Sequence, residues 1–281
     1  MHALFIVAIP VLVLLPACAA RDLVAVTAFG RDYAELAGLV IESADRWKRA
    51  CSSDADIDVV IVADEAGARA MTTSQPWQHV FALPVDGDAR SESVFMARFE
   101  TVKWPRFWQY QRVLQIDADT LVNGCLAPVF ARVTPRQLHA HPALYAEKRG
   151  WSLPESRHPL PRTPFNSGAF AFVADEFMAG HLLLMRAWIR DEIALGTEHY
   201  TDQSFVNVYM DRHGLVNTTG ALTNSTIMVR PSHGHKRTPP YAQPLLHFIA
   251  GGLNKTQTKH AEMSAYIHAA DASRLQNKAN K

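Results

Sequence analysis

The sequence has few cysteines and almost no net charge. Its 281 residues include three cysteines and no CxxC pair, which argues against the usual zinc-binding arrangements. Lys and Arg number 28 against 27 Asp and Glu, so net charge favours neither a nucleic-acid-binding protein nor a membrane-surface protein. The hydrophobic content of 48% is that of a globular protein with enough material for a core.

The motifs of several common enzyme classes are also missing. Neither G-x-G-x-x-G nor G-x-x-x-x-G-K-[ST] occurs, so the chain lacks the glycine-rich loops that hold phosphates in many nucleotide-binding proteins. HExxH and GxSxG are absent too, which argues against the metallopeptidases and hydrolases that carry them. A diphosphate ligand would therefore have to be held by a metal ion and basic side chains.

One long segment contains no acidic residue. From Arg212 to Ala261 there is no Asp or Glu, although the chain has 27 of them. The cations of this segment are Arg212, Arg230, Lys236, Arg237, Lys255 and Lys259. A charge run of this kind is usually a solvated face. A surface free of carboxylates also suits an anionic ligand, because nothing on it repels negative charge.

The first twenty residues are apolar. Residues 3–20 carry no charge before Arg21 and end in ACAA, which resembles the end of a cleaved signal peptide. Their length is marginal for a membrane span of about 20 residues, so an N-terminal signal anchor is the alternative. We expect residues 1–21 to be one or the other. The protein would then lie in the secretory pathway lumen (ER or Golgi), secreted or membrane-anchored, and would touch a membrane only through this segment.

The glycosylation sequons and the cysteines are consistent with passage through the secretory pathway. N-x-S/T sequons occur at Asn217, Asn224 and Asn254. If Cys18 belongs to the leader, Cys51 and Cys125 remain. They can form one disulfide bond or stay as two buried thiols, and the sequence leaves both alternatives open.

After Arg21 the sequence alternates between strand-like and helix-like segments. Continuous apolar runs predict strands at 22–29, 56–64, 79–85, 112–116 and 165–174. Apolar residues at helical spacing predict helices at 31–50, 65–73, 91–104, 176–195 and 200–214. This alternation predicts an α/β fold, with a mainly parallel central sheet flanked by helices. No break in composition marks a second domain, so we expect residues 22–281 to form one.

Three Asp-x-Asp triplets occur, and their positions differ. Residues 54–56 precede a strand and are expected to form a solvated turn, and residues 86–88 lead towards a helix cap. Only Asp117-Ala-Asp119 closes a long apolar strand. Ligands of parallel sheets bind beyond the carboxyl ends of the strands, so this triplet is the candidate site.

A divalent cation would reconcile this carboxylate pair with the acid-free basic segment. The two carboxylates alone would repel an anion, but hard cations bind carboxylate and phosphate oxygens together. The ligand would then be a polyphosphate. Without a glycine-rich cradle, a nucleotide-diphosphate sugar is the interpretation that we favour.

Four segments together resemble glycosyltransferase family 8, a group of nucleotide-sugar transferases with the GT-A fold. They are VLQIDADTLV, FNSGAFAF, TDQSFVN and LLHFIAGG, in the family's order and spacing, and FMARF at 95–99 resembles a fifth. The resemblance spans roughly 23–255. It implies a single GT-A (Rossmann-like) catalytic domain that moves a hexose from a UDP-sugar to an acceptor hydroxyl, with retention. The acceptor would be a carbohydrate, a protein or a lipid.

The resemblance also assigns roles to residues. Asp117, Asp119 and His247 match the family's metal ligands, and because imidazole suits Mn2+ better than Mg2+, we expect Mn2+, with Mg2+ as the alternative. Asp202 and Gln203 match positions around the donor sugar and would be the catalytic pair. The other expected substrate-binding residues are Thr27, Ala28, Phe29, Arg98, Asn166 and Lys255.

The chain departs from the family pattern after the histidine. The family has a Lys-Pro-Trp whose lysine holds a phosphate, whereas HFIAGGLNKT places Lys255 eight residues after His247 with no Pro-Trp. Lys255 could still reach the diphosphate, or Lys236 and Arg237 could replace it. The proline-rich loop 148–164 and the basic loop 229–240 are expected to be mobile and to close over donor and acceptor.

The sequence leaves two alternative functions open. The missing Lys-Pro-Trp suits a nucleotide-sugar-binding protein that has lost turnover. The segment IDADTL also resembles phosphatases of the haloacid dehalogenase type. In those enzymes the Thr lies two residues past the second Asp, whereas Thr120 follows Asp119 directly.

Overall fold

The computed structural model describes residues 21–74, 80–82, 98–143, 153, 157–197, 202–229, 242–248 and 255–279. At 72–74, 100, 255 and 271–279 it describes the backbone alone. The predicted leader 1–20, the triplet 86–88 and residues 91–97 lie outside this part of the chain. So do Lys236, Arg237 and the sequon at Asn254.

A seven-stranded sheet forms the centre of the fold, in the order β3-β2-β1-β4-β7-β6-β8. The strands β3, β2, β1 and β4 run parallel to one another, and β7 runs antiparallel to both β4 and β6. The predicted α/β fold with a mostly parallel sheet is therefore confirmed. The bounds are β1 Arg21–Ala28, β2 Ile57–Ala63, β3 Val80–Ala82, β4 Tyr110–Asp117, β6 Leu138–Pro142, β7 Phe165–Val173 and β8 Val216–Asn217.

A second, three-stranded sheet lies beside the first, in the order β5-β10-β9. Its strands are β5 Thr120–Val122, β9 Thr226–Val229 and β10 Leu245–Phe248. β5 begins three residues after β4 ends, so Asp117 and Asp119 lie where the chain passes from one sheet to the other. The candidate site is therefore at the junction of the two sheets.

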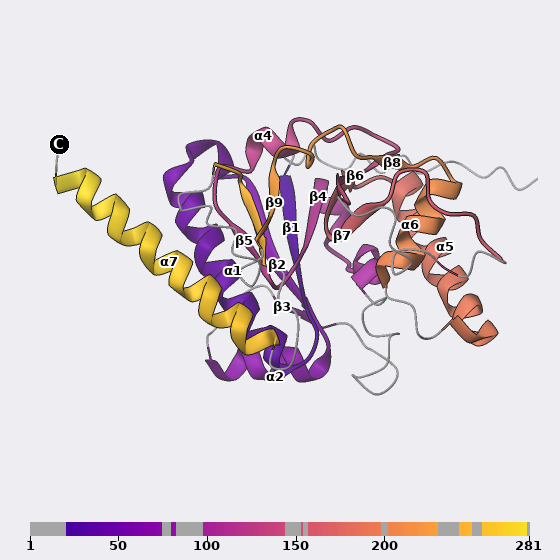
Figure 1. Ribbon diagram of the computed structural model, residues 1–281, viewed down its shortest axis with the longest axis horizontal. Helices are drawn as coiled ribbons and strands as arrows, with labels where there is room; N and C mark the ends of the chain where they lie inside the picture. Colours follow the sequence, from indigo (N-terminus) through magenta and orange to yellow (C-terminus); the bar gives the residue numbers. More distant parts are fainter. Residues whose placement is uncertain are drawn as a thin grey trace, which may run out of the picture.

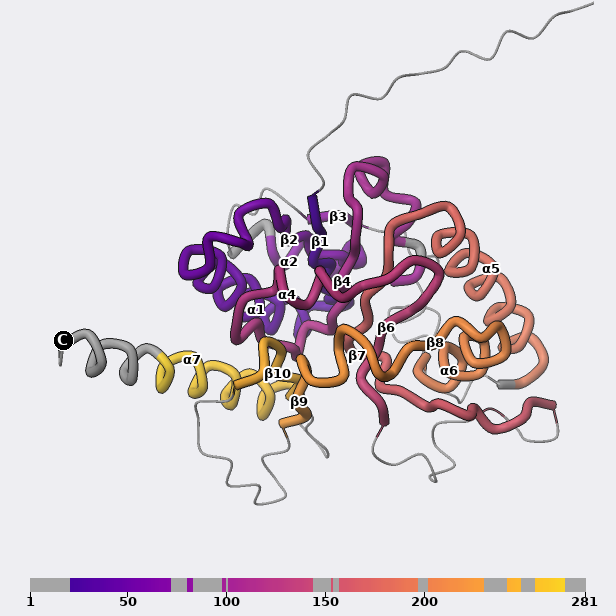
Figure 2. The backbone as a smooth tube through the Cα atoms, turned by 90° about the horizontal axis from the view of Figure 1, so that it is seen from above, coloured from indigo at the N-terminus to yellow at the C-terminus, as the bar shows by residue number. Residues whose placement is uncertain are grey.

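Helices cover both faces of the central sheet (Figure 1). On one side lie α1 Arg31–Ala50, α2 Glu65–Ser74 and α7 Lys255–Ala279, and on the other α5 Glu176–Glu192 and α6 Asp202–Arg212. Figure 2 shows the same separation from above. The short elements are the helix α4 Ala127–Phe130, the π-helical turn η5 Ile193–Thr197, and the 3-10 turns η1 Ser52–Asp54, η2 Arg98–Lys103 and η3 Phe107–Gln109.

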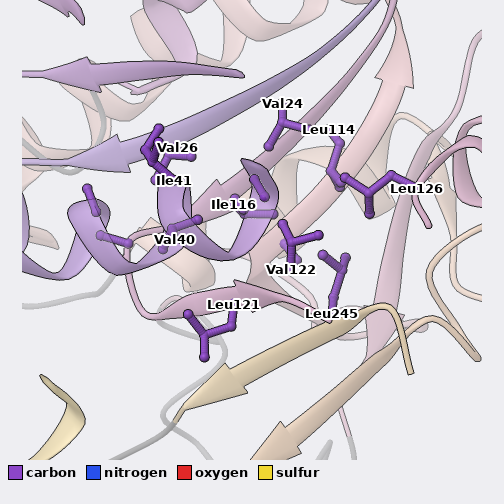
Figure 3. Packing of buried hydrophobic residues seen from close by; sticks show 14 of the residues in the cluster. Val24, Val26, Val40, Ile41, Leu114, Ile116, Leu121, Val122, Leu126 and Leu245 are labelled. Carbon is purple, nitrogen blue, oxygen red and sulfur yellow. The ribbon is translucent and has the colours of Figure 1, made fainter. Parts of the chain in front are cut away.

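The apolar run in β1 is buried on both faces, as expected of a central parallel strand. Leu23 and Ala25 pack into the core beneath α5 and α6, while Val24 and Val26 pack beneath α1. Figure 3 shows this second core, in which α1, β1, β4 and the small sheet meet. The labelled members are Val24, Val26, Val40, Ile41, Leu114, Ile116, Leu121, Val122, Leu126 and Leu245.

The long helix α7 is attached at its N-terminal half. Met263 and Ile267 are buried in the second core, and Arg46 of α1 donates a hydrogen bond to the carbonyl of Ile267 at 3.3 Å. The C-terminal end of the helix extends past the rest of the molecule (Figure 1). Among the described helices, none combines the length and the hydrophobicity that a membrane span requires.

Cys51 and Cys125 form a disulfide bond with a Cα–Cα distance of 5.7 Å. Of the two alternatives that the sequence left open, the structure has the disulfide. It joins the end of α1 to the segment before α4.

Two local expectations differ from the structure. Asp54 does not lie in a solvated turn: it is buried, and its carboxylate accepts hydrogen bonds from the amides of Leu126 and Ala127 at 2.8 and 2.9 Å. The start of α4 supplies these donors, so the carboxylate stays satisfied away from water. The predicted helix 91–104 is, over its described residues, the 3-10 turn η2, whose bounds are Arg98–Lys103.

Candidate active site

The carboxyl end of β4 holds the first acidic group of the site. Asp117 is the last residue of β4, between β1 on one side and β7 on the other. The amide of Ala118 donates to the carbonyl of Thr27 at 3.1 Å, which fixes the turn beyond the strand. Since β7 runs antiparallel, its start lies at this same edge, and Ala169 pairs with Ile116. The segment Asn166–Gly168 is thereby brought beside the turn.

His247 reaches the site from the second sheet. β10 pairs antiparallel with β5, which places His247 opposite Thr120, and the amide of Phe248 donates to the carbonyl of Asp119 at 2.9 Å. The Nε2 of His247 lies 3.1 Å from the Oδ1 of Asp119. Asp117, Asp119 and His247 each offer a ligand atom within 4.8 Å of the others. The three residues expected to bind a metal ion therefore converge.

Gly168 makes room for the histidine. A Cβ at residue 168 would lie 3.0 Å from His247 Nε2, closer still to its Cε1, and 3.0 Å from the Oδ1 of Asn166. Side-chain carbons do not approach other heavy atoms so closely, so the glycine in FNSG is required by the imidazole that packs on it. Asn166 supports this segment, because its Oδ1 accepts a hydrogen bond from the Gly168 amide at 2.8 Å.

Arg98 links two of the acidic residues. Its Nη1 lies 2.6 Å from Asp117 Oδ1, and its Nη2 forms an ion pair with Asp202 Oδ2. The guanidinium is buried and also lies over the rings of Phe99 and Phe170. Arg98 is therefore a buried residue of the site and not an exposed charge. Arg98 lies in the site, but it is engaged with carboxylates, and contact with donor phosphates stays a prediction.

Lys259 is a site residue that the sequence did not single out. It lies on α7, is 8% exposed, and its ammonium forms an ion pair with Oδ2 of Asp119. The only sequence signal was its membership of the acid-free segment. Lys255, the lysine that we expected to act here, begins α7, and its side chain is outside the described part of the structure.

Burial and neighbouring charges shift the pKa values of the three residues in the Asp117–Asp119–His247 cluster in different directions. Burial opposes ionisation of Asp119, but His247 and Lys259 outweigh it and lower the pKa of Asp119 to about 2. Burial, together with Asp119 and Asp202, raises the pKa of Asp117 to about 6 against the opposing effect of Arg98. Burial would lower the pKa of His247, but Asp119 and Asp117 more than offset it, and its pKa is raised.

The residues expected around the sugar lie at the start of β7 and of α6. The Oε1 of Gln203 accepts a hydrogen bond from the amide of Ser167 at 3.2 Å, and the Ser167 hydroxyl donates to Asp202 Oδ2 at 3.3 Å. The side chain of Asn207 exchanges hydrogen bonds of 2.7 and 2.9 Å with the backbone of Phe165. Neither Ser167 nor Asn207 was predicted, and together they hold α6 against β7.

The end of β1 borders the site on the other side. Thr27 accepts a hydrogen bond from Gln115 Nε2 at 3.2 Å, and the same amide donates to the carbonyl of Arg98 at 3.2 Å. Ala28 ends the strand, and Phe29 packs its ring into the core. Their expected contact with the nucleotide stays a prediction.

Two further residues near the cluster were not predicted. Tyr33, in the first turn of α1, lies close enough to Lys259 and Asp119 for both to act on its pKa, which burial raises. His141 pairs with Asn166 at the edge of β7, and burial, with His247 nearby, lowers its pKa. Nothing in the sequence around either residue distinguishes it from many others.

The described part of the proline-rich loop is attached to α5 and α6. Arg162 and Thr163 contact the carboxylate of Asp211, at 3.4 and 3.2 Å. His158 lies 3.1 Å from Glu192 and accepts a hydrogen bond of 2.7 Å from Arg212. Movement of this loop as a lid stays a prediction. Of the basic loop 229–240, residues 230–240 lie outside the described part of the chain.

No protein-family model and no curated protein sequence matches the chain. Solved structures do. A crystal structure of the galactosyltransferase LgtC in complex with donor and acceptor sugar analogs covers 88% of this chain and 95% of its own, with 15% identity and a TM-score of 0.57. An active-site mutant of LgtC, in which a glutamine is replaced by glutamate, matches over the same shares with 15% identity and a TM-score of 0.56.

These matches establish the fold. LgtC is a family 8 galactosyltransferase with the GT-A fold, and the layers, the mostly parallel sheet and the flanking helices of this chain match it. The GT-A fold expected from the sequence resemblance is thus confirmed.

Proposed function

We propose that this protein is a metal-dependent glycosyltransferase of the family 8 kind. It would move a hexose from a UDP-sugar to an acceptor hydroxyl, with retention at the anomeric carbon. The observation that carries the proposal is the convergence of Asp117, Asp119 and His247 within 4.8 Å at a strand edge of a glycosyltransferase fold. The described residues of the four quoted motifs meet at this edge of the sheet.

The donor set fits a divalent cation. It combines carboxylate oxygens with an imidazole nitrogen, a combination that suits Mn2+ better than Mg2+. Nε2 of His247 faces Asp119 at 3.1 Å, so Nε2 is the ligand nitrogen that we propose. A bound cation would act as a Lewis acid and offset the charge that develops on the departing UDP.

The chain's own residues would position the sugar. Asp202 is fixed by Arg98 and by the Ser167 hydroxyl, so its carboxylate is held in one orientation. The Oε1 of Gln203 accepts from the Ser167 amide, and among the described residues its NH2 group has no hydrogen-bond partner, so we propose that it donates to a sugar hydroxyl. With Asn166, these groups would hold the anomeric carbon for attack by the acceptor, a positioning effect. An active-site glutamine in LgtC agrees with the role of Gln203.

The LgtC complex contains donor and acceptor sugar analogs, which favours a nucleotide sugar as donor and a carbohydrate as acceptor here. A protein or lipid acceptor is the alternative. The Cys51–Cys125 disulfide is typical of an oxidising compartment and favours the secretory route inferred from residues 1–21.

A specific observation favours a second candidate. No Lys-Pro-Trp follows His247, so a protein that binds a nucleotide sugar without transferring it is the alternative function. Both candidates require binding of the nucleotide with a metal ion. Only the first requires release of UDP when a suitable acceptor is added.

Calorimetric titration of the protein with UDP and a panel of UDP-sugars, in Mn2+ and in EDTA, tests the proposal. We expect binding that depends on Mn2+ and that Asp119→Ala abolishes. Asp56→Ala is the matched control, because Asp56 belongs to another Asp-x-Asp triplet but is exposed at the opposite end of the sheet. Absence of UDP binding with every metal would refute the proposal.

A further inference from the structure

Each carboxylate oxygen of Asp119 faces a basic side chain. Oδ1 faces Nε2 of His247 at 3.1 Å, and Oδ2 is paired with the ammonium of Lys259. Among the described residues Asp119 is the carboxylate that pairs with Lys259. The lysine is 8% exposed, and a buried ammonium is costly unless an anion meets it.

A cation on Asp119 would disturb this arrangement. A divalent ion held by Asp117, Asp119 and His247 would lie beside the ammonium of Lys259, and like charges at such short range repel. Lys259 would then have to share its partner or find another anion. Asp117 and Asp202 are already paired with Arg98, so neither is a ready new partner for Lys259.

The negative charge needed by Lys259 would arrive with the donor. In the proposed function, on which this inference rests, a diphosphate binds to the same cation. Its phosphate oxygens are the only new anions in the site. Lys259 is attached to a helix whose next buried positions, Met263 and Ile267, lie in the core, so its side chain can turn while its backbone stays in place.

We propose that Lys259 is an exchangeable counter-ion: it neutralises Asp119 until a divalent cation binds, and then pairs with the diphosphate of the nucleotide sugar. Lys259 therefore opposes binding of the cation alone and favours binding of the nucleotide. It is a substrate-binding residue on α7, outside the motifs that the sequence resemblance supplied.

Removing the charge should change the two affinities in opposite directions. We expect Lys259→Met to bind Mn2+ alone about tenfold more tightly than the wild-type protein, and UDP in saturating Mn2+ about tenfold more weakly. Lys259→Arg keeps the charge and should restore both affinities most of the way. Lys48→Met, which removes another partly buried lysine far from the cluster, should change neither. Both affinities are measured by calorimetry, independently of any transfer activity.

A merely structural role for Lys259 would weaken both affinities together, and that result would overturn the inference. If the wild-type protein bound neither Mn2+ nor UDP, the proposed function itself would fail. The two failures are therefore distinguishable.

A labelling experiment on the wild-type protein covers the case in which Lys259→Met does not fold. An amine-reactive reagent is applied in EDTA, in Mn2+, and in Mn2+ with UDP, and labelled lysines are quantified by mass spectrometry. We expect labelling of Lys259 to rise several-fold with Mn2+ and to fall again with UDP, since the flexible side chain becomes accessible to the reagent when its ammonium loses its partner. Equal labelling of Lys259 in EDTA and in Mn2+ would overturn the inference.

Discussion

The imidazole of His247 packs directly on the backbone of Gly168, at a distance that leaves no room for a methyl group. Gly168→Ala should therefore displace the ring from Asp119 and from the metal-binding position. We expect Mn2+ affinity to fall about 10- to 100-fold, the usual cost of disturbing the support of a metal ligand. The free energy of unfolding should fall by about 1–3 kcal/mol, because the site becomes overpacked.

Gly180→Ala is the control for this substitution. Gly180 lies on α5, and a Cβ there would meet no atom within 4 Å. We expect unchanged Mn2+ affinity and up to about 1 kcal/mol of added stability, since Ala favours a helix over Gly. Equal Mn2+ affinity of the Gly168 variant and the wild-type protein, measured by calorimetry, would show that His247 does not bind the cation.

Arg98 should contribute to stability through its two carboxylate partners. Arg98→Gln leaves Asp117 and Asp202 without their shared cation, and removing one member of a buried ion pair costs about 3–5 kcal/mol. Both carboxylates keep some contact with water, so we expect a loss of about 2–3 kcal/mol in urea denaturation. Lys should replace Arg98 poorly, since one ammonium cannot reach both partners in the same planar geometry.

The matched control is Arg162→Gln. The side chain of Arg162 is 78% exposed and its pair with Asp211 is 3.4 Å long, so we expect a loss below about 1 kcal/mol. If the two variants unfold at the same urea concentration, the bridge between β4 and α6 is not a stabilising element.

The disulfide closes a loop of 74 residues between Cys51 and Cys125. Loop-closure entropy predicts that Cys51→Ser lowers the free energy of unfolding by roughly 4 kcal/mol. The measurement is urea denaturation of the variant and of the wild-type protein with and without reductant. Thiol titration of the unfolded wild-type protein, without reductant, should detect neither Cys51 nor Cys125. Reactivity of both residues would contradict the bond.

The sequence predicts those parts of the fold that local patterns determine. The bounds of α1 are those predicted at 31–50, and β1 differs from its prediction by one residue at each end, because both are long apolar patterns with clear boundaries. The edge position of Asp117 and Asp119 also follows from sequence, since ligands of parallel sheets collect at one edge. The direction of β7 does not: strand and helix alternation predicts a parallel strand, and nothing in FNSGAFAF encodes its reversal against β4.

Contacts between segments that are far apart in the sequence could not be predicted from it. Asp54 is buried because Leu126, 72 residues away, supplies an amide to it, and the same Asp-x-Asp letters would describe a solvated turn equally well. Lys259 meets Asp119 across 140 residues of sequence. A lysine on a helix is usually solvated, so only the packing of α7 on α1 shows which lysine enters the site.

The raised pKa values of Asp117 and His247 predict how cation binding depends on pH. A bound divalent ion needs Asp117 ionised and His247 neutral, so each proton still held must be released on binding. Asp117 loses its proton near its pKa of about 6, and His247 loses its own above the ordinary histidine value. Asp119, with a pKa of about 2, is ionised throughout this range. Mn2+ affinity should therefore rise with pH through about 6 and become constant above the pKa of His247.

Calorimetry in buffers of different ionisation enthalpy should detect a released proton below that point and none above it. Affinity that stays constant across this range would mean that neither group is a ligand.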